Sequence, residues 1–286
     1  MSDDDLREAR RWFADELRFV ARIEDQNVVD AFAAAPRERF VGPGPLRMLS
    51  QWNLKDYWTP PDSGPDAVYH DVLIAYDEQR RLNNGQPSLW AFVFDKLRVA
   101  RGERVVHLGC GMGYYSAVLA ELVGPTGKIS AIEIDEPLAE RARAALAFWP
   151  QVTAINGDGA TVSLGESDVV VASAGATHPL PAWLECLSAK GRLVFPMTTT
   201  NAGGGMLLVK RRRRDEFEAR FLCQVLFYEF SGARDADAND RLELAFAQDR
   251  GAGVKSVRTD EHAEQATCWF HGDGWCLSRR ELDPTP

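Results

Sequence analysis

The sequence predicts an α/β protein built on a doubly wound, mainly parallel sheet, with helices before this core and a β-rich extension after it. Three observations predict this fold. Strand-like and helix-like apolar runs alternate between Pro87 and Met197, as is typical of a parallel sheet covered on both faces. Three glycines separate the first core strand from its helix. The 286 residues are 45% hydrophobic, which is enough for one sizeable core.

The individual elements follow from the spacing of the apolar residues. Two helices are expected in residues 5–35, where apolar residues recur at helical spacing. Residues 42–65 are rich in Gly and Pro and are expected to form a loop whose Trp52 and Trp58 pack on the core. The core is then expected to run helix 88–97, strand 105–108, helix 114–122, strand 128–134, helix 136–148, strand 151–155, strand 168–172, helix 182–187 and strand 191–196.

The last part of the chain is expected to be rich in strands. Runs starting at Met206 and Phe221 have strand character, an amphipathic helix is expected near 240–247, and residues 267–278 are hairpin-like. The expected organisation is therefore N-terminal helices with an inserted loop over residues 1–66, an α/β core over 67–214, and C-terminal strands and a hairpin that complete or cap the core over 215–286.

Composition argues against several classes of protein. A formal net charge of -9 disfavours nucleic acid as a partner, and no apolar run is long enough to span a bilayer. The acidic start does not resemble a signal peptide, and the five cysteines form no CxxC pair, so a cytoplasmic protein with reduced thiols is expected. The histidines and cysteines show no metal-ligand spacing, and no metal site is expected.

The glycines at 109, 111 and 113 lie where a doubly wound fold binds ligands, outside the carboxyl end of a strand. Glycine permits tight turns there and lets a ligand approach the backbone. A dinucleotide site has the spacing GxGxxG, but Tyr114 stands where the third glycine of that motif would fall, which argues against NAD. The GxGxG spacing suits S-adenosylmethionine, which has no pyrophosphate to place at the helix start. The glycines alone are equally compatible with a simple tight turn.

Two acidic residues at the ends of later strands support a cofactor site. Glu133 ends the second core strand, where a carboxylate can accept hydrogen bonds from both ribose hydroxyls; the alternative role of capping the next helix suits Asp135 better. Asp158 follows the third strand and can accept from an adenine amine, although its GDG context is also ordinary turn chemistry. The predicted cofactor contacts are His107, Gly109, Cys110, Gly111, Gly113, Tyr114, Glu133, Ile134, Gly157, Asp158 and Gly159.

Several segments together resemble the protein-L-isoaspartate O-methyltransferase family over roughly residues 27–232. "VVDAFAAAPRERFV" is similar to the family's N-terminal helix and the segment after it. "NNGQPSLWAFVFDKL" stands where the family has its TISQP segment, and "DVVVASAGATHPLPAWLECLSAKGRLVFPM" is similar to its fourth strand, Pro-containing loop and next strand. The resemblance implies a Rossmann-like class I methyltransferase that transfers a methyl group from S-adenosylmethionine to a side-chain or isopeptide carboxylate.

Two residues depart from the family pattern. Gly85 stands where the family has a serine that contacts the substrate carboxylate, and His107 stands where such methyltransferases usually have Asp or Glu. An imidazole supplies no reliable negative charge at neutral pH. The Asn83-Asn84-Gly85 variant also resembles paralogues that methylate carboxylates of modified peptides. The substrate-side candidates are Asn84, Gly85, Gln86, Ser88 and His178.

A carboxylate substrate simplifies the chemistry, because its unperturbed pKa of about 4 makes it a nucleophile at neutral pH without a general base. The sequence therefore predicts a carboxyl O-methyltransferase acting on a protein, peptide or small molecule. A methyltransferase of small-molecule or modified-peptide carboxylates and a non-catalytic binding module are the alternatives. If Gly85 only replaces a hydroxyl, Gly85→Ser is expected to improve methyl transfer to isoaspartyl peptides; if the backbone needs glycine there, the same change is expected to damage the site.

Overall fold

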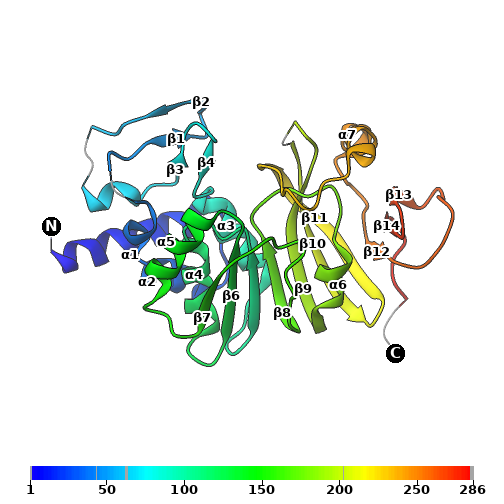
Figure 1. The fold of residues 1–286 in the computed structure, drawn as a ribbon, viewed down its shortest axis with the longest axis horizontal. Coiled ribbons are helices and arrows are strands. Elements are labelled where there is room, and N and C mark those ends of the chain that lie inside the picture. The colour runs from blue at the N-terminus through cyan, green and yellow to red at the C-terminus, as the bar shows by residue number, and fades with distance from the viewer. Residues whose placement is uncertain (1, 43, 62–63, 202, 284–286) are drawn as a thin grey trace. The chain divides into compact units, whose positions relative to one another are not determined.

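The computed structural model describes residues 2–42, 44–61, 64–201 and 203–283, and it divides the chain into two compact units (Figure 1). Unit 1 comprises residues 1–103 and 110–157, and unit 2 comprises residues 104–109 and 158–286. The two units cut across the three ranges expected from the sequence, because β5 (Arg104–Leu108) and β6 (Lys128–Glu133) belong to different units.

Unit 1 begins with the two expected helices, and both start at side chains that cap them. α1 (Asp3–Val20) has a capping box, in which Ser2 and Asp5 each accept a hydrogen bond from the other's backbone N–H. α2 (Gln26–Ala34) is capped by the Asp25 side chain. The two helices pack against each other and against α3 (Pro87–Leu97), so their apolar faces form one side of the core of unit 1.

The core of unit 1 is aromatic and encloses a buried cation. Arg37, in the short helix η1 (Arg37–Phe40), is fully buried, and its guanidinium lies over the rings of Phe13 and Tyr114. It donates hydrogen bonds of 2.6 to 2.8 Å to the carbonyls of Val68, His70 and Val72, at and after the end of the short helix η2 (Pro65–Val68). Because these bonds offset much of the cost of burying this charge, they fix residues 68–72 on the core.

The segment expected to be a loop instead contributes to a small antiparallel sheet. β1 (Met48–Ser50), β2 (Asn53–Trp58), β3 (Leu73–Asp77) and β4 (Leu82–Asn83) pair in the order β2-β1-β3-β4. The prediction that the two tryptophans pack on the core is wrong, since Trp52 is 91% exposed and Trp58 is 44% exposed. The strands are short and carry few β-branched residues, which is why their composition resembles that of a loop.

The remaining elements of unit 1 are those expected from the alternating pattern. α4 (Tyr114–Val123) leads to β6, and α5 (Glu136–Leu146) leads to β7 (Val152–Asn156). β6 and β7 are parallel, with Glu133 opposite Asn156, and both helices pack on β6. The carboxyl ends of the two strands therefore lie side by side.

Unit 2 holds the other parallel strands and the C-terminal extension. β5, β8 (Ser167–Ala172) and β9 (Leu187–Thr198) are parallel, and the sheet continues with antiparallel strands in the order β9-β10-β11-β12-β14-β13. These are β10 (Gly203–Arg213), β11 (Glu216–Leu226), β12 (Ser256–Arg258), β13 (Cys268–Gly272) and β14 (Trp275–Ser278), joined by α6 (Pro181–Glu185) and α7 (Ala236–Asp249).

The long β10–β11 hairpin, visible in unit 2 in Figure 1, contains the two expected strands, but β10 begins at Gly203 rather than Met206 and β11 begins at Glu216 rather than Phe221. Val169, Val170, Val171 and Ala172 are fully buried, as expected for a parallel strand covered on both faces. Among the described residues, no helix is both long enough and apolar enough to cross a bilayer.

Candidate functional site

The loop after β5 adopts backbone angles that glycine accepts and other residues avoid. Gly109, Gly111 and Gly113 have φ values of 70°, 56° and 96°. Gly113 precedes the first turn of α4, and a Cβ on it would lie 2.8 Å from Leu146 Cδ1. The tight turn is therefore real, and a ligand role for the loop depends on the groups around it.

Tyr76, on β3, lies against the middle glycine of this loop. A Cβ on Gly111 would lie 2.9 Å from Tyr76 Cε2. Burial raises the pKa of Tyr76 well above its ordinary value, while a backbone hydrogen bond with Met112 lowers it, so the phenol stays neutral. Sequence reasoning missed Tyr76, because it stands outside any recognisable motif and reaches the loop only through the small sheet.

Glu133 ends β6 with its carboxylate hydrogen-bonded to the glycine loop. One oxygen accepts from the N–H of Gly111 at 2.7 Å, and the other accepts from the N–H of Asp135 at 3.0 Å. The residue is 7% exposed, and its burial raises the pKa of the carboxyl group, although these backbone donors lower it. Each carboxylate oxygen has a further lone pair, so the group can still accept bonds from a diol.

Asp135 has the capping role that the sequence suggested for it rather than for Glu133. Its side chain accepts from the N–H of Leu138 at 3.1 Å at the start of α5, and it pairs with Arg80 at 2.7 Å. Ile134, between the two acids, is 54% exposed. The site thus presents an apolar side chain directly beside the buried carboxylate.

The end of β7 holds the end of β6 in place. Asn156 Nδ2 donates to the carbonyls of Glu133 at 3.0 Å and Ile134 at 3.2 Å, and the N–H of Gly157 donates to the carbonyl of Glu133 at 3.0 Å. Sequence reasoning missed Asn156. Its position opposite Glu133 in the β6–β7 register is the signal that a prediction of strand pairing would have used.

Asp158 and Gly159 open a turn in unit 2. One Asp158 carboxylate oxygen accepts from the N–H of Ala160 at 2.9 Å, and the Asp158 carbonyl accepts from the N–H of Val162 at 2.8 Å. The carbonyl of Gly159 accepts from Trp183 Nε1 at 3.0 Å. The turn chemistry is therefore present, and a contact between Asp158 and adenine stays a prediction.

His107 is fully buried in β5, with its Nε2 atom 2.8 Å from Ser173 Oγ. Burial lowers its pKa to about 3, because the low-dielectric interior disfavours the charged ring. The imidazole is therefore neutral near pH 7 and supplies no charge to the loop. It connects the end of β5 to the residue after β8.

Two predicted cofactor contacts have side chains that point into the protein. Tyr114 is 1% exposed and packs edge-on against Phe32. Cys110 is 6% exposed, with its Sγ 3.6 Å from the carbonyl of Gly111, and burial raises the pKa of its thiol. A cofactor contact at these two residues stays a prediction, and the buried side chains leave their main-chain atoms to make it.

The substrate-side segment is fastened to the region before β3 and to β3 itself. Asn84 is 5% exposed and exchanges two bonds with Ile74, its N–H donating at 3.0 Å and its Oδ1 accepting at 2.8 Å. Gln86 Nε2 donates to the carbonyl of Asp71 at 2.7 Å, and the N–H of Ser88 donates to Asp71 Oδ1 at 2.8 Å. The segment is thereby held rigidly at the start of α3.

Gly85 cannot be replaced by serine without strain. Its φ is 74°, and a Cβ on it would lie 2.8 Å from Trp90 Nε1 and 3.3 Å from Tyr115 Cε2. Its carbonyl accepts from the Tyr115 hydroxyl at 3.0 Å, and its N–H donates to Asn83 Oδ1 at 3.0 Å. This geometry argues against the expectation that Gly85→Ser improves the site and favours the expectation of damage.

Ser88 is the remaining hydroxyl of this segment. It is half-buried in the first turn of α3, and its Oγ makes no hydrogen bond to any residue that the structure describes. The partial positive charge at a helix N-terminus favours a bound anion. The Asp71 carboxylate already accepts from the Ser88 N–H at this helix end, so it is the Ser88 hydroxyl that can still donate to a further carboxylate.

His178 lies on the loop after β8, as expected, in a half-buried position. Its Nδ1 is 2.9 Å from Thr177 Oγ1, and its ring stacks on Trp275 with centroids 6.1 Å apart. Burial lowers the pKa of His178, which keeps the ring neutral. Nothing in this arrangement requires His178 to act as a base.

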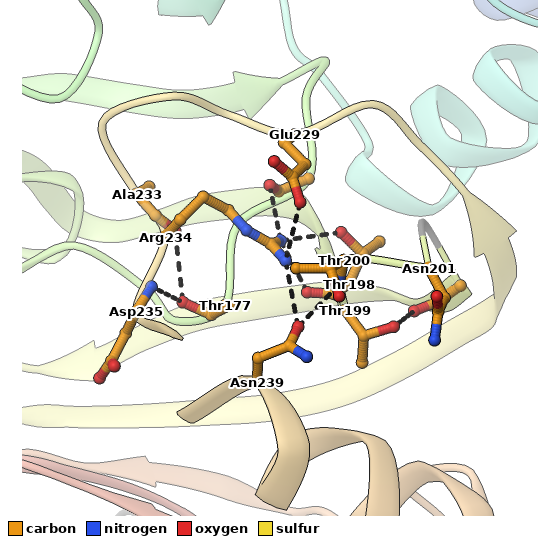
Figure 2. A network of polar contacts seen from close by, with 12 residues as sticks. Thr177, Thr198, Thr199, Thr200, Asn201, Glu229, Ala233, Arg234, Asp235 and Asn239 are labelled. Carbon is orange, nitrogen blue, oxygen red and sulfur yellow. Dashed lines mark hydrogen bonds and ion pairs between the residues drawn. The ribbon is translucent and has the colours of Figure 1, made fainter. Parts of the chain in front are cut away.

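Figure 2 shows the polar network that holds the loop after β8. Arg234 donates to the carbonyls of Gly175 at 3.2 Å and Thr198 at 2.8 Å, and it pairs with Glu229 at 3.5 Å. The N–H of Asp235 donates to Thr177 Oγ1 at 2.9 Å. The residues between β11 and α7 therefore fix the loop after β8, a role that the sequence pattern did not reveal.

Comparison with known proteins identifies the family. The model of the family Protein-L-isoaspartate(D-aspartate) O-methyltransferase matches residues 60–234. The Protein-L-isoaspartate O-methyltransferase of Ignicoccus hospitalis is 29% identical over 67% of this chain and 83% of its own length. Protein-L-isoaspartate O-methyltransferase 2 of Archaeoglobus fulgidus is 30% identical over 68% of this chain and 80% of its own length.

Solved structures agree on the fold. A protein-L-isoaspartate O-methyltransferase structure has a TM-score of 0.62 at 20% identity, covering 82% of this chain and 69% of the other. A Plasmodium falciparum structure, described as a putative protein-L-isoaspartate O-methyltransferase in complex with S-adenosyl-L-homocysteine, has a TM-score of 0.60 at 14% identity, covering 78% and 98% of the two chains. With its class I methyltransferase fold, this chain belongs to the protein-L-isoaspartate O-methyltransferase family and is an S-adenosylmethionine-dependent O-methyltransferase.

Proposed function

We propose that the glycine loop of residues 109–113, the Glu133 carboxylate and the Ile134 side chain hold the cofactor, with a further contact from Gly157. The observation that carries this proposal is the Glu133 carboxylate, which is anchored to the N–H of Gly111 at 2.7 Å and keeps lone pairs for a diol. Its position at the end of β6 is where an acid receives ribose hydroxyls in related nucleotide-binding folds.

The chemistry of these groups fits S-adenosylmethionine. A buried carboxylate suits the two ribose hydroxyls, the exposed Ile134 side chain suits a flat adenine ring, and glycines at positive φ leave the backbone open to close approach. When bound, the cofactor supplies a methyl group attached to a positively charged sulfur. The glycine loop and Glu133 orient it.

We propose that the substrate is an isoaspartyl carboxylate in a protein or peptide, and that the Ser88 hydroxyl takes the place of the serine lost at Gly85. Trp90 and Tyr115 fill the space that a side chain on Gly85 would need. Ser88 instead offers a hydroxyl without a partner among the described residues, in the first turn of α3. A hydroxyl bond to a carboxylate contributes about 1.5 to 3 kcal/mol.

The substrate segment also adjoins a cavity that suits a peptide. Asp71, which bonds to Gln86 and Ser88, lines a cavity of about 650 Å³ together with Trp52 and Trp58. Aromatic side chains around a concave surface are typical of sites that bind ligands of this size. This cavity supports a substrate that extends beyond its reacting carboxylate.

The reaction asks little of acid–base groups. The substrate carboxylate attacks with its own negative charge, so the chain has no proton to remove. The protein has to hold the carboxylate in line with the methyl group and to exclude water. Such positioning lowers the activation barrier by up to roughly 7 to 11 kcal/mol. In this proposal the Ser88 hydroxyl holds the carboxylate.

Methyl transfer from labelled S-adenosylmethionine to an isoaspartyl peptide tests the proposal, with the matched aspartyl peptide as a control. We expect a base-labile methyl ester on the isoaspartyl peptide only. Ser88→Ala is expected to lower kcat/KM about tenfold or more while cofactor affinity stays unchanged. Ser163→Ala, the same change in a loop of unit 2, should change neither. Transfer only to other carboxylates would favour the small-molecule or modified-peptide alternative, and cofactor binding without any transfer would favour a binding module.

A further inference from the structure

Four metal-binding side chains that stand apart in the sequence lie together in the C-terminal extension of unit 2. They are His262, Cys268, His271 and Cys276, and their ligand atoms all lie within 4.8 Å of one another. The two cysteines are buried, and the two histidines are half-buried. The sequence predicted no metal site here, because the spacing of these residues matches no familiar metal motif.

The hairpin geometry explains how the cluster forms. Cys268 and His271 are three residues apart on β13, so in a regular strand they would face opposite sides. The register with β14 shifts between Cys268 and Phe270, and such a bulge resets the alternation. His271 pairs directly with Cys276 on β14. The bulge and this pairing bring three of the four side chains to one place.

The distances within the cluster match a tetrahedral metal site. Cys268 Sγ lies 3.6 Å from His262 Nε2 and 3.8 Å from His271 Nδ1. A tetrahedral zinc ion with bonds of about 2.3 Å to sulfur and about 2.0 Å to nitrogen separates these ligands by about 3.5 Å. Small movements would therefore seat an ion between them.

His262 is already oriented as a ligand. Its Nδ1 lies 2.7 Å from the carbonyl of Asp260, a position in which the ring N–H donates to that carbonyl. This bond leaves Nε2 unprotonated and turned toward Cys268. Metal-bound histidines almost always donate their second ring nitrogen in this way. The Asp260 carboxylate lies 3.7 Å from the same Nδ1 and adds negative charge nearby.

An ion also has a way in. A cavity of about 550 Å³ is lined by both histidines and by three carboxylates, Asp260, Glu261 and Asp273. The carboxylates attract a cation toward the cluster. The two thiols favour a thiophilic metal such as zinc over magnesium or calcium, which prefer oxygen ligands.

We propose that His262, Cys268, His271 and Cys276 bind one zinc ion. Both thiols lose their protons to solvent when the metal binds. Four protein ligands leave no open position, so the site is structural. The ion fastens residues 259–267, which contain no helix or strand, to the β13–β14 hairpin. This would replace the expectation that the chain has no metal site.

Metal analysis of the full chain, purified from medium with added zinc, tests this proposal. We expect one zinc per chain in the native protein and in Cys186→Ser, which changes a thiol outside the cluster. We expect loss of the zinc in Cys268→Ser and in His262→Gln. Zinc retained at full stoichiometry in both of these variants would overturn the proposal.

Cobalt binding to the native chain provides a readout that does not depend on the folding of a variant. A Co²⁺ ion in a Cys₂His₂ site should give intense visible bands and a thiolate charge-transfer band, both lost on addition of zinc. A native chain that contains no zinc and gives neither band with cobalt would contradict the proposal, and the four side chains would then only hydrogen-bond to one another.

Discussion

Two glycine turns in unit 1 look alike in backbone but differ in what the sequence reveals about them. Gly111, in the cofactor loop, and Gly85, in the substrate segment, both have positive φ, and in both a Cβ would meet an aromatic ring within 3 Å. The spacing around Gly111 indicates a ligand loop. Gly85 is distinctive in the sequence only by comparison with the serine that the family has there. A glycine at positive φ therefore indicates only a backbone conformation. The residues around it indicate whether the turn also binds a ligand.

The largest effect is expected from a substitution that disrupts the first turn, at Gly111. Gly111→Val should weaken S-adenosylmethionine binding at least about 100-fold, or about 2.7 kcal/mol, because a branched residue at positive φ distorts the loop and its Cβ meets Tyr76. Calorimetry measures the affinity. Gly111→Ala combined with Tyr76→Ala removes that contact but keeps the strain, so partial recovery is expected. Undiminished affinity in Gly111→Val would mean that the loop is not the cofactor site.

A substitution in the second turn, at Gly85, should mainly lower the stability of the fold. Gly85→Ser should lower the free energy of unfolding by about 2 to 4 kcal/mol, from a strained φ and from overpacking against Trp90. Urea denaturation of the native and variant chains gives this difference. Ser88→Ala in the same segment is the control and should cost less than about 1 kcal/mol. A Gly85→Ser chain of native stability with faster methyl transfer would restore the simpler view of Gly85 as a lost hydroxyl.

The link between the cofactor loop and β6 can be tested separately. Glu133→Gln keeps the shape of the side chain but removes its charge, so cofactor affinity should fall about tenfold to a hundredfold. Glu136→Gln, a nearby acid in the first turn of α5, should leave affinity unchanged. The pKa of Glu133 is raised. On acidification, cofactor affinity should therefore begin to fall at a higher pH than it would if this carboxyl group had its ordinary pKa. Equal affinity in both variants would refute the assignment.

The last of these tests concerns His107, at the base of the glycine loop. Its pKa is about 3 when folded and about 6.5 when unfolded, so the unfolded chain binds the extra proton first. Stability is therefore lost as pH falls from about 6.5 toward 3. Between pH 7 and 5 this group alone should cost about 2 kcal/mol of unfolding free energy. His107→Gln should reduce the pH dependence by that amount; an unchanged dependence would show that the buried ring is not what makes the fold acid-sensitive.

The parts of the site formed by residues close in sequence could be predicted. The strand–glycine loop–helix unit, the acid at the end of β6 and the capping role of Asp135 depend on local spacing, and the structure contains each of them. Local patterns specify such features, because turn geometry and capping involve neighbours along the chain.

The parts that depend on contacts between distant segments could not be predicted. Tyr76 reaches Gly111 from β3, and the cysteine–histidine cluster needs a bulge in β13. The exposed Trp52 and Trp58 follow from a small sheet whose strands look like loop residues. In each case the register of strands decides which side chains meet, and composition does not encode that register.

The central claim is that this chain methylates a carboxylate with S-adenosylmethionine bound at the Gly111–Glu133 loop. Transfer of a labelled methyl group to an isoaspartyl peptide, measured for the native chain and for Glu133→Gln at limiting cofactor, tests it most directly. We predict a base-labile ester with the native chain and about tenfold or more slower labelling with the variant. No labelled ester from a native chain that binds the cofactor, or equal labelling by both chains, would contradict the claim.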